Sequence, residues 1–170
     1  LPTVETARKL YEEFSEVIHL PIDVAANVAG NRLDLKVEKL PVDAPILDLG
    51  VQSTIKLSQA IRAAGTVILN GPAGVFEDNN FAFGTVEMLN ACAETEAFVV
   101  IGGGHTATLI SKKGLADRMG HISTGGGACL DFLSGKTLPA VESLETSAQE
   151  FGVSILSEIE VDGDSTERIL

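Results

Sequence analysis

Residues 97–107 read AFVVIGGGHTA, an apolar run that leads directly into three glycines. The apolar half, residues 97–101, is typical of a strand in a parallel sheet that is covered on both faces. The glycine half predicts a tight turn that opens a helix, since glycine adopts positive φ and lets the backbone approach a ligand closely. Unpaired amides and the helix dipole at such a turn both favour a phosphate group.

Two more apolar runs end in turns of the same kind. Residues 66–69 precede Asn70-Gly71-Pro72-Ala73-Gly74, and residues 121–123 precede Gly125-Gly126-Gly127. One glycine turn is a weak indication of phosphate binding. Three of them at the strand–helix junctions of one domain predict a surface that holds several phosphates of a nucleotide.

The pattern around these turns predicts an α/β fold, because strands and helices alternate and give a mainly parallel, Rossmann-like sheet in three αβα layers. Ligands of such sheets bind beyond the carboxyl ends of the strands, where all three turns fall. We expect strands at 46–48, 66–69, 97–101 and 121–123. Helices are expected at 53–65, with Ser53 as the N-cap, around 86–93, from 105 and at 127–133.

The N-terminal part has a different pattern. A helix with Thr3 as N-cap is predicted by the spacing of Val4, Ala7, Tyr11 and Phe14. Residues 17–24 are expected to form a strand, and the alternation at 33–37 indicates a second strand in a small antiparallel patch. Residues 145–170 fit either strand or helix, and we treat them as an extension of uncertain packing.

Composition limits the possible functions. The 170 residues are 45% hydrophobic and 21% charged, as in a globular domain. No apolar run is long enough to span a membrane, and no leader follows Leu1, so we expect a fragment or a processed piece. The net charge of −12 argues against nucleic acid or an anionic membrane as partner. With only 12 Lys and Arg, further cations for the phosphates are expected on a part that is absent.

Several motifs point away from other classes of site. Cys92 and Cys129 are too far apart for a Cys-x-x-Cys pair, and two buried thiols in a reducing compartment are expected. A Walker-type P-loop is absent from the sequence. Residues 102–107 match the Gly-x-Gly-x-x-Ala fingerprint of an NAD-binding oxidoreductase, but the next strand ends at Ser123 without the expected acid. That dinucleotide function remains the alternative.

Five blocks of the sequence together resemble phosphoglycerate kinases. The blocks are LNGPAGVFE at 69–77, IGGGHTA at 101–107, HISTGGGA at 121–128, GKTLP at 135–139 and LDLG at 47–50. Their order and spacing agree with the family over roughly residues 3–144. The resemblance implies a partial C-terminal, nucleotide-binding domain over residues 1–144, and it does not cover 145–170.

The resemblance implies reversible phosphoryl transfer between 1,3-bisphosphoglycerate and ADP, which gives 3-phosphoglycerate and MgATP in glycolysis. The nucleotide partner is Mg-ADP or Mg-ATP, whereas 3-phosphoglycerate binds through an N-terminal lobe that this sequence lacks. We therefore expect the isolated chain to be inactive, and the full-length protein to be a cytoplasmic monomer. A non-catalytic remnant that binds a partner through its bare face is a third possibility.

The resemblance also assigns roles to individual residues. Gly125, Gly126 and Gly127 would present amides to the phosphoryl group in transfer, and Glu77 would accept hydrogen bonds from a ribose hydroxyl. The other implied nucleotide-binding residues are Asn70, Gly71, Pro72, Gly102, Gly103, Gly104, His105 and Thr106.

His105 departs from the family pattern, which has an aspartate beside the nucleotide-bound Mg²⁺. Imidazole is a poor ligand for Mg²⁺, which prefers oxygen. We therefore expect His105 to contact the nucleotide and not a metal. His19, Asp23, Asp48 and His121 are predicted to have structural roles only.

Overall fold

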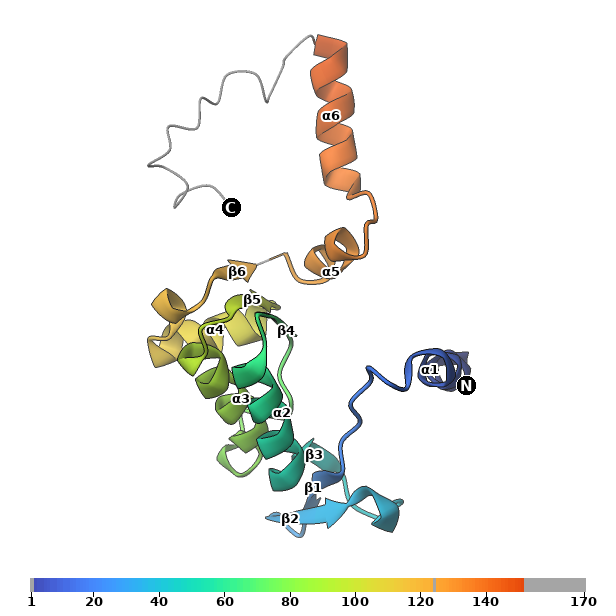
Figure 1. Cartoon of the computed structure of the whole chain (residues 1–170), viewed down its shortest axis with the longest axis vertical. Coiled ribbons are helices and arrows are strands. Elements are labelled where there is room, and N and C mark those ends of the chain that lie inside the picture. The colour runs from blue at the N-terminus through green and yellow to red at the C-terminus, as the bar shows by residue number, and fades with distance from the viewer. Residues whose placement is uncertain (1, 124, 152–170) are drawn as a thin grey trace. The chain divides into compact units, whose positions relative to one another are not determined.

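The computed structural model describes residues 2–123 and 125–151 (Figure 1). The chain divides into two compact units. The first unit comprises residues 1–61 and 73–91, and the second comprises residues 62–72 and the chain from residue 92 onward. Helix α6, Pro139–Phe151, crosses residue 144, and the domain boundary at that point stays a prediction. The remainder of the extension, from residue 152, lies outside the described residues.

The first unit contains a small antiparallel sheet in the order β2-β1-β3. Strand β1, Asp23–Val28, pairs with β2, Asn31–Lys36, and a turn at Ala29 and Gly30 with positive φ joins them. Strand β3, Ile46–Leu49, also pairs antiparallel with β1. The predicted antiparallel patch is therefore confirmed. The strand expected at 46–48 exists, but its assignment to the parallel sheet was wrong, because it pairs antiparallel with β1 in this patch.

Two details of the N-terminal prediction are wrong. Helix α1, Pro2–Phe14, begins before Thr3, so Thr3 lies inside the helix and is not its N-cap. The strand predicted at 17–24 begins only at Asp23. Pro21 has no amide hydrogen, and the amide of Ile22 donates to Ser53 Oγ at 2.9 Å, so neither residue can donate to a neighbouring strand.

The start of helix α2, Val51–Ala63, also differs from its prediction. Ser53 was expected to cap this helix from outside but lies buried in its first turn. The cap is supplied from β1, where the carboxylate of Asp23 accepts hydrogen bonds from the amides of Gln52 (2.9 Å) and Ser53 (2.7 Å). A cap that lies so far away in sequence leaves no local signature.

The second unit contains a parallel sheet in the order β4-β5-β6. Its strands are Thr66–Asn70, Phe98–Gly102 and His121–Ser123, and helices α4 (Gly104–Lys113) and α5 (Gly127–Leu133) follow the last two. These elements confirm the predicted α/β class. Strand β5 was expected to be covered on both faces. Val99 and Ile101 are buried, but Phe98 at its start is 56% exposed, so the coverage is incomplete there.

Helix α3, Phe83–Glu94, runs from the first unit into the second and buries Leu89 and Cys92. Short 3-10 turns lie at Val37–Lys39, Asn79–Phe81 and Ala116–Arg118. Both cysteines are free, and burial raises the pKa of Cys92 to about 11. Within the part of the chain that the structure describes, every helix is too short or too polar to cross a membrane.

Candidate functional site

The three glycine turns follow three adjacent strands that end in register. Asn70 at the end of β4 pairs with Gly102 at the end of β5, and Gly102 pairs with Ser123 at the end of β6. Since parallel strands end at one edge of a sheet, the turns after them share that edge. We call residues 70–72, 102–106 and 125–127 the glycine edge.

The first two turns of the glycine edge are in direct contact. The amide of Gly71 donates to the carbonyl of Gly102 at 3.2 Å. A Cβ at Gly102 would lie 2.5 Å from Asn70 Oδ1, so residue 102 must be glycine if Asn70 keeps this position. The turn after β4 differs from the other two in one respect, because it leads into a loop and not directly into a helix.

Helix α4 begins on the glycine edge without a side-chain cap. Its N-cap residue, Gly103, has φ 95° and no side-chain hydrogen bond. The amides of a helix's first turn have no acceptor within the helix, and they carry the positive end of its dipole. Gly104 and His105 in this turn are exposed.

The third turn repeats this arrangement. Gly126 precedes α5 with φ 53° and no side-chain cap, and the amide of Gly125 donates to Ser123 Oγ at 3.2 Å. Gly125 and Gly127 are exposed. The structure therefore brings eleven predicted site residues onto one edge of one unit: Asn70, Gly71, Pro72, Gly102, Gly103, Gly104, His105, Thr106, Gly125, Gly126 and Gly127.

Thr106 fits a ligand with acceptor oxygens. Its residue is 1% exposed, and its hydroxyl has no hydrogen-bond partner among the described residues. A buried hydroxyl without a partner is costly. A phosphate oxygen at the first turn of α4 would supply the acceptor that this hydroxyl lacks.

The side chains of the glycine edge do not fit a magnesium site of their own. Among the described residues, no three His, Cys, Asp or Glu side chains lie together as metal ligands. The edge offers the imidazole of His105, a nitrogen donor, whereas Mg²⁺ takes oxygen ligands. A magnesium ion at this edge would therefore be held through nucleotide phosphates and water.

Glu77 is separated from the other predicted site residues by the division of the chain. It is exposed on the connection between β4 and α3, in the part that belongs to the first unit. Its role as acceptor for a ribose hydroxyl stays a prediction.

A buried ion pair in the first unit was missed by the sequence analysis. Arg32 on β2 donates to the carboxylate of Asp48 on β3 at 2.9 Å, and the Asp48 side chain is fully buried. Asp48 was predicted to be structural, but Arg32 received no role. Their pairing depends on the register of the antiparallel sheet, and the local sequence pattern gives no signal for it.

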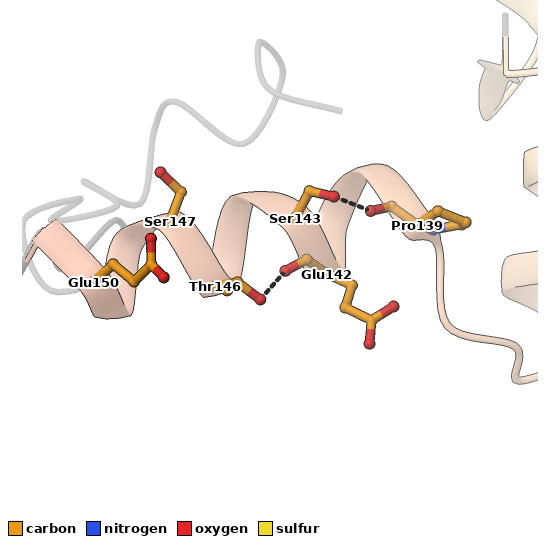
Figure 2. Close-up of a pocket in the computed structure, with 6 residues that line it drawn as sticks. All are labelled: Pro139, Glu142, Ser143, Thr146, Ser147 and Glu150. Atoms are coloured by element: carbon orange, nitrogen blue, oxygen red, sulfur yellow. Dashed lines mark hydrogen bonds between the residues drawn. The ribbon is translucent and has the colours of Figure 1, made fainter.

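Two grooves are lined by described residues outside the glycine edge. One is lined by the polar face of α6, and Figure 2 shows that Ser143 and Thr146 there bond to the carbonyls of Pro139 and Glu142. The other is apolar and lies along α1. Neither groove is lined by a predicted site residue, and the hydroxyls of Ser143 and Thr146 in the first already donate hydrogen bonds within α6.

The fold and the glycine edge define a class of protein. It is the α/β proteins whose parallel strands end in glycine turns. Comparison with known proteins narrows this class. The family model described as phosphoglycerate kinase matches residues 2–136. The chain belongs to the phosphoglycerate kinase family.

Individual relatives agree with this assignment. The chain is 44% identical over 149 residues to the phosphoglycerate kinase of Methanocorpusculum labreanum, covering 88% of this chain and 36% of the relative. It is 48% identical over 145 residues to that of Methanothermobacter thermautotrophicus, covering 85% and 35%. The chain thus spans about a third of the length of these relatives.

Solved structures give the same result. The phosphoglycerate kinase of Pyrococcus horikoshii superposes with a TM-score of 0.77 and 37% identity, over 87% of this chain and 37% of that one. That of Coxiella burnetii superposes with a TM-score of 0.73 and 32% identity, over 81% and 38%. These comparisons do not support the NAD-binding alternative.

Proposed function

We propose that this chain is the nucleotide-holding part of a phosphoglycerate kinase. The whole enzyme would transfer the acyl phosphoryl group of 1,3-bisphosphoglycerate to ADP, giving 3-phosphoglycerate and ATP as a step of glycolysis. The observation that carries the proposal is the glycine edge, where uncapped amides gather at the register position shared by Asn70, Gly102 and Ser123. A cytoplasmic location follows from this assignment as part of the proposal.

The chemistry fits an edge made of amides. In the forward direction an oxygen of the ADP β-phosphate forms a bond to phosphorus, and the bond between phosphorus and the acyl oxygen breaks. The leaving carboxylate needs no proton, and in reverse the same carboxylate is already ionised. Such a transfer requires alignment of the phosphates and stabilisation of their charge more than acid–base catalysis.

Within this proposal each turn has a separate task. The turn at 102–106 lies along the nucleotide phosphates, with first-turn amides of α4 and the Thr106 hydroxyl as donors. The amides of Gly125, Gly126 and Gly127 face the phosphoryl group in transfer. Asn70 contacts the phosphates, and Pro72 fixes the loop beside the nucleotide. Bound magnesium would neutralise phosphate charge, and His105 would donate to a phosphate oxygen.

The isolated chain is expected to bind nucleotide weakly and to be inactive. It has 12 Lys and Arg against 24 Asp and Glu, so it offers few cations for the acid-sugar substrate. We infer that the substrate's basic cluster belongs to the rest of the enzyme. With 3-phosphoglycerate and MgATP the chain alone should give no turnover.

A single added charge tests the position of the phosphates. A Cβ at Gly104 would meet no atom within 4 Å, so Gly104→Asp places a carboxylate at the start of α4 without a clash. An acid at a helix N-terminus stabilises the fold by about 0.3–1 kcal/mol. The same acid repels a phosphate, so we expect ADP affinity, measured by calorimetric titration, to fall roughly tenfold or more.

The control for this variant is Gly65→Asp. Gly65 is equally open and precedes the opposite end of β4, so it adds the same charge away from the glycine edge. Equal loss of ADP affinity in both variants would contradict the proposed phosphate position. Enhancement of NADH fluorescence by the parent chain, without a response to ADP, would favour the dinucleotide alternative instead.

A further inference from the structure

The glycine edge presents few kinds of ligand group. Residues 70–72, 102–106 and 125–127 include no Asp, Glu, Lys or Arg. All of them belong to the second unit, and His105, which is exposed, has the one titratable side chain among them. The side chains of the edge therefore offer a ligand one imidazole and the neutral oxygens of Asn70 and Thr106.

Hydrogen-bond donors for an anion gather at residues 102–106, which we call the α4 turn. The first bond of the helical ladder runs from the amide of Ala107 to the carbonyl of Gly103 at 3.0 Å, so the amides of residues 104–106 precede the ladder. Thr106 gives an independent indication of a ligand. Its residue is 1% exposed, and its hydroxyl has no hydrogen-bond partner among the described residues.

Oxygen ligands for a metal are scarce at the same place. Asn70 Oδ1 lies against the backbone of Gly102, where a Cβ would be 2.5 Å from it. The carbonyl of Gly102 already accepts a hydrogen bond from the amide of Gly71 at 3.2 Å. Proteins usually bind Mg²⁺ through carboxylates as well as substrate phosphates. The α4 turn therefore has donors for phosphate oxygens but no carboxylate for the metal.

We propose that the α4 turn binds the phosphates of the nucleotide as a metal-free anion, so that magnesium weakens this binding. The inference rests on the proposed function and deepens it. Mg²⁺ coordinates the same phosphate oxygens that the amides bind, and it cancels part of their negative charge. A carboxylate on the protein could offset this loss by binding the metal, but the glycine edge contains none.

The first experiment compares ADP with and without the metal. The whole 170-residue chain is titrated with ADP by calorimetry, once in EDTA and once in excess MgCl₂, at the same pH and ionic strength. We expect metal-free ADP to bind roughly tenfold more tightly, as for about one hydrogen bond to a charged group. Equal binding, or tighter binding with magnesium, would overturn the inference.

A carboxylate introduced at residue 105 should change the preference. His105→Asp supplies an oxygen ligand for Mg²⁺, and an acid in the first turn of a helix favours the fold. We expect this variant to bind MgADP at least as tightly as metal-free ADP. Gly65→Asp adds a carboxylate before the opposite end of β4 and should keep the preference of the parent chain. An unchanged preference in His105→Asp would contradict the inference.

The Thr106 hydroxyl gives a second variant that does not add charge. Thr106→Val keeps the shape of the side chain, and stability in urea should not fall, because the lost hydroxyl has no partner among the described residues. Affinity for metal-free ADP should fall roughly tenfold, and affinity for MgADP should fall less. A purely structural role for Thr106 would leave the ratio of the two affinities unchanged, and that result would also count against the inference.

Inorganic pyrophosphate separates the inference from the proposed function. In EDTA it should shift the amide resonances of Gly104 and His105, and added magnesium should reverse these shifts. A chain that binds pyrophosphate but not ADP overturns the proposed function and leaves the anion site intact. A chain that prefers MgADP overturns the inference and leaves the proposed function intact. A chain that binds none of these ligands overturns both.

Discussion

Helices α2 and α3 of the first unit differ from α4 and α5 of the second in how the amides of the first turn are bound. In the first unit, carboxylates accept the free amides: Asp23 binds those of Gln52 and Ser53 at the start of α2, and Asp48 binds that of Gly84 in α3. In the second unit, α4 and α5 begin at glycines without side-chain caps. A helix is stabilised when protein acceptors bind the amides of its first turn. When no side chain accepts from these amides, they can bind a ligand instead.

The difference shows where the fold is stabilised and where it is kept ready for an anion. The acidic caps of the first unit would repel a phosphate at the places they occupy. The glycines of the second unit add no side chain that could compete with one. This contrast, and not the number of glycines, separates a structural helix start from a candidate phosphate site.

The largest expected effect is the loss of a cap in the first unit. Asp23→Ala removes an acceptor of two amides and leaves the Ser53 hydroxyl, 2.6 Å from Asp23 Oδ1, without that partner. We expect the free energy of unfolding, from urea denaturation, to fall by about 2–4 kcal/mol.

Asp131→Ala provides the control for Asp23→Ala. Its ion pair with Lys136 is exposed, and its loss should cost no more than about 1 kcal/mol. If the two variants lost the same stability, the carboxylate caps of the first unit would have no special role, and the comparison would fail.

The second effect is smaller and concerns two neighbouring glycines of the second unit. Gly103 has φ 95°, so Gly103→Ala should destabilise the fold by about 1–2 kcal/mol. Gly104 lies inside α4 in open space, so Gly104→Ala should stabilise it by about 0.5–1 kcal/mol. Opposite signs in urea denaturation would confirm the geometry of this turn, and equal signs would contradict it.

The second unit could be predicted from sequence because its signals are local. Each strand, turn and helix there is a continuous segment, so the glycine runs and apolar runs fix the order of the elements. The parallel sheet then brings the turns to one edge without any further information. The prediction that β5 is covered on both faces was wrong at Phe98, because the exposure of this residue depends on which elements cover the sheet.

The first unit was predicted less well because its key contacts join distant segments. Serine is a residue type that often caps helices, so Ser53 was predicted as the N-cap. The cap of α2 comes instead from Asp23, thirty positions earlier. In the sequence, Arg32 has the pattern of a charged residue on the solvent-exposed face of a strand. Only the pairing of β1 with β2 and β3 brings it to Asp48.

The last and smallest effect is a pH dependence that comes from the Asp23 cap. Burial alone raises the pKa of Asp23, but hydrogen bonds from the Ser53 hydroxyl and the amides of Gln52 and Ser53 together bring it below the ordinary value of 3.8. A carboxyl with a lowered folded-state pKa stabilises the fold above its unfolded pKa, and this contribution is lost as the pH falls through the folded value. The difference in unfolding free energy between the parent chain and Asp23→Asn should therefore be constant near pH 7 and shrink below pH 3.8.

The effect of Asp23→Asn should be smaller than that of Asp23→Ala, because the protonated carboxyl and the amide both retain an acceptor oxygen. A difference that grows on acidification would mean that the charged form of Asp23 is not the one that the fold favours.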